Sequence, residues 1–103
     1  MQIDLFMMHL RGFRDAHGLQ WDVDARVEKC FEEDVELWLA SQFSALGGGM
    51  DELKGEAIDR LITALALLDA LGVKDPLHCA YEKLVEVAGR EEYIAMREGK
   101  TDA

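Results

Sequence analysis

Residues 27–72 read VEKCFEEDVELWLASQFSALGGGMDELKGEAIDRLITALALLDALG, two helix-forming runs separated by three glycines. In the first run, residues recur at steps of three or four, which predicts one buried helical stripe. The stripe consists of Val27, Phe31, Val35, Trp38, Gln42 and Leu46. Glycine disfavours helix and permits left-handed turns, so residues 47–49 end the first helix. Two helices joined by so short a turn are expected to pack antiparallel.

The ends of these two helices carry recognisable signals. Asp22 or Asp24 can cap the first of them, because a short carboxylate accepts hydrogen bonds from the free N–H groups of a first turn. Asp51 is predicted to cap the second helix, which reaches about residue 71 and stops at Gly72.

Two further helices are predicted outside this hairpin. One covers about residues 3–16 and ends at Gly18. The other starts at Asp75 and Pro76, a cap followed by a first-turn proline, and continues past Gly89 to about Met96. No stretch alternates as a strand would. The expected fold is therefore all-α, a four-helix bundle-like protomer forming a single domain over residues 1–103.

Composition limits the classes of partner. The chain has 103 residues, of which 50% are hydrophobic and 31% charged, as in ordinary globular domains. A net charge of −10 argues against nucleic acid and anionic membranes as binding partners, because both are negatively charged as well. No apolar run could span a bilayer, and the start has no basic leader. The two cysteines are expected to be reduced thiols of a cytoplasmic protein.

The second half of the third predicted helix suggests assembly. From Leu61 to Leu71 it is apolar on nearly every face, with Thr63 and Asp69 as exceptions. Four short helices cannot cover all of these faces. We therefore expect a homodimer or a higher even oligomer such as a homotetramer.

Two pairs of carboxylates stand out as candidate site residues. Glu33 and Glu36 are three residues apart on one helix of the hairpin, and Glu56 and Asp59 are three apart on the other. Residues at this spacing share a helix face, so antiparallel packing can bring both pairs together. Leu37, Leu39 and Phe43 flank the first pair on the helical wheel, which makes simple solvation of the carboxylates less expected.

Four converging carboxylates need a counter-charge. Magnesium is the natural one, since it takes oxygen ligands and keeps water sites for substrate phosphates. Such an ion could grip a triphosphate and activate a water for phosphoryl hydrolysis. The alternative is an ordinary solvated acidic surface, because acidic pairs are common in so acidic a chain.

The residues then resemble a known family, the MazG-like all-α nucleoside triphosphate pyrophosphatases. The motif is Glu33-Asp34-Val35-Glu36, then 19 intervening residues, then Glu56-Ala57-Ile58-Asp59. An apolar helix follows, ended by Gly72. The family also tends to have a lysine, an asparagine and an arginine on its last helix, and here Lys83 and Arg90 match while Val87 replaces the asparagine. The resemblance covers about residues 20–92.

The resemblance implies hydrolysis of a nucleoside triphosphate to the monophosphate and pyrophosphate, dependent on Mg²⁺ or Mn²⁺. It implies that Glu33, Glu36, Glu56 and Asp59 are the metal ligands and catalytic residues, with one glutamate able to orient the water instead. Lys83 and Arg90 would contact the triphosphate, although Glu86 stands at ion-pair spacing from both. Trp38 and Phe43 could stack on the base, although aromatic residues at helical spacing more often belong to the core.

Two other functions stay open at this point. The chain could be a non-catalytic acidic helical dimer that acts as an adaptor for a basic partner. It could also hold a carboxylate-bridged redox metal, but none of its three histidines follows a glutamate by three residues as that site would require.

Overall fold

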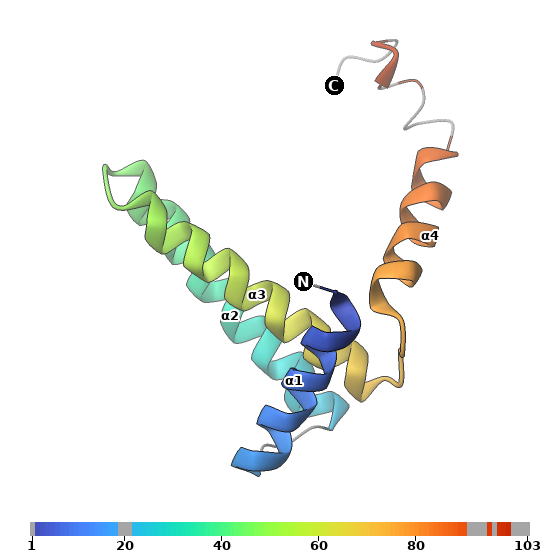
Figure 1. Cartoon of the computed structure of the whole chain (residues 1–103). Coiled ribbons are helices and arrows are strands. Elements are labelled where there is room, and N and C mark those ends of the chain that lie inside the picture. Colours follow the sequence, from blue (N-terminus) through green and yellow to red (C-terminus); the bar gives the residue numbers. More distant parts are fainter. Residues whose placement is uncertain (1, 19–21, 91–94, 96, 100–103) are drawn as a thin grey trace.

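The computed structural model describes residues 2–18, 22–90, 95 and 97–99. Within these ranges the chain forms four helices, α1 (Ile3–His17), α2 (Val23–Ala45), α3 (Met50–Ala70) and α4 (Pro76–Ala88) (Figure 1). The same ranges contain no strand. The all-α prediction is confirmed, and each predicted helix is present, the first three with their ends shifted by a residue or two. The predicted continuation of the fourth helix past Gly89 is wrong, because α4 ends at Ala88 and Gly89, a poor helix former, caps it. Most of the predicted stretch beyond Arg90 lies outside the described residues.

Local sequence explains most helix ends. Asp22 caps α2 by accepting a hydrogen bond from the Ala25 N–H at 2.8 Å. Asp75 accepts from the His78 N–H at 3.2 Å ahead of the first-turn proline of α4. Gly18 ends α1 in the left-handed region, with φ 59°. The predicted cap Asp51 is wrong, because α3 begins earlier and Gly49 occupies the capping position.

The α2–α3 hairpin is the most extensively packed pair of helices (Figure 1). The face of α2 buried in the structure carries Cys30, Glu33 and Ala40. Two of these three side chains are small, which lets the two helix backbones approach closely. On α3, Thr63 is buried and its backbone carbonyl accepts the Cys30 thiol at 3.5 Å.

The predicted buried stripe of α2 is wrong for the single chain. Its apolar members point to solvent: Phe31 is 68% exposed, Trp38 61% and Leu46 88%, and Val27 and Val35 are exposed as well. The reason is that α3 packs on the side of α2 that carries the smaller residues. A large apolar surface of α2 is therefore uncovered. We call the side chains of Val27, Phe31, Val35, Trp38 and Leu46 the outer stripe.

The core lies where α1 crosses α3. Met7 and Leu10 of α1 are buried against Leu65 and Ala66 of α3. Two arginines of α1 reinforce this contact through the same α3 carboxylate, Asp69. Arg11 Nε lies 2.7 Å from Asp69 Oδ1, and Arg14 Nη1 lies 3.3 Å from Asp69 Oδ2.

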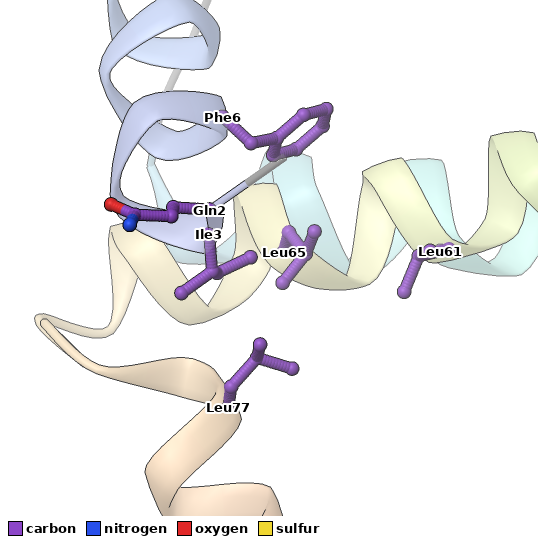
Figure 2. A pocket seen from close by; sticks show the side chains of 6 residues that line it. All are labelled: Gln2, Ile3, Phe6, Leu61, Leu65 and Leu77. Carbon is purple, nitrogen blue, oxygen red and sulfur yellow. The ribbon is translucent and has the colours of Figure 1, made fainter.

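Helix α4 stands apart from the hairpin along most of its length (Figure 1). Its first turn meets the rest of the chain, where Pro76 is buried and Leu77 borders a 220 Å³ apolar pocket. Figure 2 shows Leu77 facing Ile3 of α1 and Leu65 of α3 across this pocket. The arrangement is compatible with a helical bundle, but α4 leaves its own apolar residues Tyr81, Leu84 and Val85 exposed. Among the described helices, none is long and apolar enough to cross a membrane.

Candidate metal centre

The structure brings three of the four predicted acidic residues together. Glu33 of α2 and Glu56 and Asp59 of α3 each offer a carboxylate oxygen, and these oxygens lie within 4.8 Å of one another. The packing of α2 against α3 in the hairpin brings these oxygens together. We call these three residues the acidic cluster. Three of the four residues that the i, i+3 spacings singled out therefore lie together, and their role as metal ligands stays a prediction.

Burial differs strongly across the acidic cluster. Glu33 is 6% exposed, Glu56 is half-buried, and Asp59 is open to solvent. A carboxylate as buried as Glu33 is rare unless something compensates its charge. The cluster is therefore deep at Glu33 and accessible from the side of Asp59.

One basic side chain contacts the buried end of the cluster. Lys29, one turn before Glu33, places its Nζ 3.3 Å from Glu33 Oε1 and 3.4 Å from Glu32 Oε2. The other oxygen, Glu33 Oε2, is buried and has no hydrogen-bond partner among the described residues, and the same holds for Glu56 Oε2. An unsatisfied buried polar atom costs about 1–3 kcal/mol, so each of these two acceptor oxygens is unfavourable without a partner.

The fourth predicted residue, Glu36, lies beside the cluster rather than in it. Desolvation of Glu56 raises the pKa of that carboxyl, and repulsion from Glu36, Asp59 and Glu33 raises it further, together with a side-chain hydrogen bond with Glu36. Burial and the negative charges of three neighbouring carboxylates therefore act together on Glu56.

The nearest arginine in sequence does not neutralise the cluster. Arg60 follows Asp59, but its Nε pairs with Asp34 Oδ1 and its Nη1 lies 3.5 Å from Cys30 Sγ. Asp34 stands two residues before Glu36, about 200° around the helix. The Arg60 guanidinium thus links α3 to Asp34 and Cys30 of α2 rather than to the carboxylates of the acidic cluster.

The three predicted substrate-binding residues lie elsewhere in the single chain. Lys83 Nζ and Arg90 Nη2 each lie 3.5 Å from a Glu86 carboxylate oxygen, the ion pairs that their spacing also allowed. Both residues belong to the α4 region, which stands apart from the hairpin in Figure 1. Trp38 is on the outer stripe and does not line the cavity next to Glu36. Contact of these residues with a substrate stays a prediction.

Sequence reasoning did not single out Lys29 or the cavity beside the cluster. The four-residue spacing from Lys29 to Glu33 is a signal that could have found the ion pair. The cavity measures 470 Å³ and extends from the cluster toward the hairpin turn. Its lining residues are Glu36, Leu39, Ala40, Phe43, Glu52 and Glu56. Their meeting depends on the register between α2 and α3, which the sequence alone leaves open.

Comparison of this chain with protein-family models, with curated proteins and with solved structures finds no significant match. The similarity to the MazG-like family therefore rests on the acidic motif and its surroundings alone. What the site can do has to be argued from its own geometry and donor atoms.

Proposed function

We propose that the chain is a magnesium-dependent nucleoside triphosphate pyrophosphohydrolase of the MazG-like type. The observation that carries the proposal is the meeting of Glu33, Glu56 and Asp59 from two helices, with buried and unpartnered oxygens on Glu33 and Glu56. In an ordinary acidic surface, the carboxylates would instead be solvated and would lie farther apart. The reaction converts a nucleoside triphosphate and water to the nucleoside monophosphate and pyrophosphate.

The donor set fits a hard divalent cation. All three clustered side chains offer carboxylate oxygens, and no thiol or imidazole belongs to the cluster, which favours Mg²⁺ or Mn²⁺ over softer metals. When bound, such a cation supplies positive charge for phosphate oxygens and lowers the pKa of a coordinated water. Glu33, Glu56 and Asp59 would hold it, with Glu36 as the fourth predicted ligand.

The remaining roles follow from the positions of the side chains. Lys29 holds one oxygen of Glu33, and the other oxygen is buried with no hydrogen-bond partner among the described residues. Glu36 faces the cavity beside Glu56, so it can also orient the attacking water and accept its proton. Lys83 and Arg90 are proposed to meet the triphosphate once they exchange Glu86 for phosphate oxygens.

Assembly belongs to the same proposal. The outer stripe of α2 and the apolar face of α4 are exposed in the single chain, and a second copy would cover them. A homodimer or homotetramer is therefore the proposed working form. The same uncovered surface favours the second candidate function, a non-catalytic helical dimer whose acidic face binds a basic partner.

Pyrophosphate release from a panel of ribo- and deoxyribonucleoside triphosphates, with Mg²⁺ and with a chelator, separates the two functions. We expect Mg²⁺-dependent release by the wild type and its loss in Glu36→Gln and Glu56→Gln, each of which removes a charge while keeping the shape. Glu28→Gln is the matched control, because Glu28 is an exposed acid of α2 outside the acidic cluster. Release by both site variants at the wild-type rate would contradict the proposal, and so would an inactive wild type that Mg²⁺ fails to stabilise.

A further inference from the structure

The 470 Å³ cavity next to the acidic cluster has two unlike walls. Leu39, Ala40 and Phe43 of α2 form an apolar wall, and Glu52 and Glu56 of α3 face it, with Glu36 at the border. Its volume falls within the roughly 300–1,000 Å³ typical of small-molecule sites. Glu56 belongs both to this cavity and to the acidic cluster, so the two adjoin at this residue. A ligand bound through phosphates at the cluster can extend into the cavity.

The ring of Phe43 is held in place by the hairpin turn. A Cβ added at Gly48 would lie 2.1 Å from Cδ1 of the ring and 2.3 Å from Cε1, so the ring packs directly on the glycine backbone. The Gly48 N–H also donates to the Phe43 carbonyl at 2.8 Å. Phe43 remains 53% exposed, with its side chain at the cavity wall. A positioned, half-open aromatic ring suits the stacking of a planar group.

The polar side chains that line the cavity all end in carboxyl groups. The lining contains three carboxylates and no basic or amide side chain. Glu52 stands one turn before Glu56 on α3, toward the hairpin turn, and has no hydrogen-bond or ion-pair partner among the described residues. A planar group that reaches Phe43 therefore meets the free carboxylate of Glu52. That carboxylate attracts N–H donors and repels carbonyl oxygens.

We infer that this cavity is the base subsite of the nucleotide, that Phe43 stacks on the base, and that Glu52 selects bases carrying an exocyclic amino group. The inference rests on the proposed nucleotide hydrolysis. Cytosine and uracil provide the sharpest contrast. They differ at position 4 of the ring, where cytosine has an amino donor and uracil has a carbonyl acceptor. At N3 the polarity is reversed, so the contrast tests a contact of Glu52 with position 4. The cavity should therefore favour cytosine over uracil.

The test compares kcat/KM for dCTP and dUTP with Mg²⁺ in the wild type and in variants. We expect the wild type to favour dCTP by about tenfold or more, the size of a hydrogen bond to a charged group. Glu52→Gln should bring the ratio toward one, because an amide can donate to the uracil carbonyl as well as accept. Phe43→Leu and Gly48→Ala should raise KM for both nucleotides, the second by displacing the ring. Asp51→Asn, an exposed neighbour outside the cavity lining, is the control and should leave the ratio unchanged.

Several outcomes would overturn the inference and leave the proposed function standing. These are equal kcat/KM values for dCTP and dUTP, or a wild-type ratio retained in Glu52→Gln. A second measurement tests the subsite where no nucleotide is hydrolysed. CMP titrated in the presence of Mg²⁺ should shift the NMR signals of the Phe43 ring, and UMP should shift them less at equal concentration. Unmoved Phe43 signals with CMP would reject the base subsite.

Discussion

Carboxylates from α2 and α3 meet at the contact between these helices. Burial and the charges of its neighbours raise the pKa of one of them, Glu56. Its raised pKa means that the folded chain holds this proton more tightly than the unfolded chain does. Protonated Glu56 therefore contributes stability that is fully present below the ordinary value of 4.5 and is lost as the pH rises through the raised pKa. Cation binding competes with the same proton, so Mg²⁺ affinity should rise over this window.

Melting temperatures of the metal-free protein between pH 4 and pH 8 test this expectation. The wild type should lose stability relative to Glu56→Gln as the pH increases, because the glutamine side chain does not titrate. A constant difference between the two proteins across the range would contradict the raised pKa of Glu56.

Asp59 gives a complementary prediction at the exposed rim of the cluster. Asp59→Asn keeps the shape and removes one of the charges that repel Glu56, so it should raise the melting temperature in the presence of a chelator. It should also shrink the stabilisation by Mg²⁺, which for the wild type is about 2.7 kcal/mol at a hundredfold excess over Kd. Asp51→Asn, on the same helix but outside the cluster, provides the baseline. If Asp59→Asn and Asp51→Asn changed the melting temperature and its rise with Mg²⁺ to the same extent, the acidic cluster would be an ordinary acidic surface.

At this scale the sequence predicted which acids could meet, but not how each one would sit. The three-residue spacings and the short glycine turn were enough to bring Glu33, Glu56 and Asp59 together. The burial of Glu33, its ion pair with Lys29, and the contact of Phe43 with Gly48 depend on side-chain conformations and interhelical register. Neither of these is encoded in a periodicity.

Among the elements, helix positions were easier to predict than helix faces. Capping residues such as Asp22 and Asp75 act within one turn, so local sequence decides them. The buried face of α2 depends instead on what packs against it. The strongest apolar periodicity, which includes Phe31 and Trp38, indicated a buried stripe, yet α3 packs on the side of Cys30 and Ala40. An apolar periodicity identifies a helix face that is expected to be buried, but it does not identify which helix or which chain packs on that face.

The attachment of α1 to α3 depends on a pairing that the sequence did not indicate. Asp69, whose side chain is 9% exposed, accepts from Arg11 and Arg14. Asp69→Asn should therefore lower the free energy of unfolding by roughly 1–3 kcal/mol, because two charged hydrogen bonds at a largely buried acceptor are weakened. Urea denaturation measures this directly. Asp15→Asn is the control, since Asp15 pairs with Arg14 at the surface and should cost about 0.5 kcal/mol or less. Equal effects of the two variants would show that the α1–α3 pairing contributes little.

For the whole molecule, the dimensions indicate an open arrangement of helices. The radius of gyration is 17.0 Å, against about 13 Å for a compact domain of 100 residues. The core at Met7, Leu10, Leu65 and Ala66 is small, while the outer stripe and the apolar residues of α4 face solvent. The sequence predicted incomplete coverage of α3, but among the described helices α2 carries the most exposed large apolar side chains. A single chain therefore leaves many of its large apolar side chains exposed, although half of its residues are hydrophobic.

The last prediction is that the outer stripe forms the interface between two copies. From Val27 to Leu46 the stripe extends about 28 Å along α2, long enough for the roughly 800 Å² per partner of a standard interface. Phe31→Glu and Trp38→Glu place a charge at its centre and should convert a dimer to a monomer in sedimentation measurements. Lys54→Glu, an exposed charge reversal on α3, is the control and should leave the dimer intact. A wild type that stays monomeric from micromolar to millimolar concentrations, or a Trp38→Glu variant that remains a dimer, would place the interface elsewhere or exclude it.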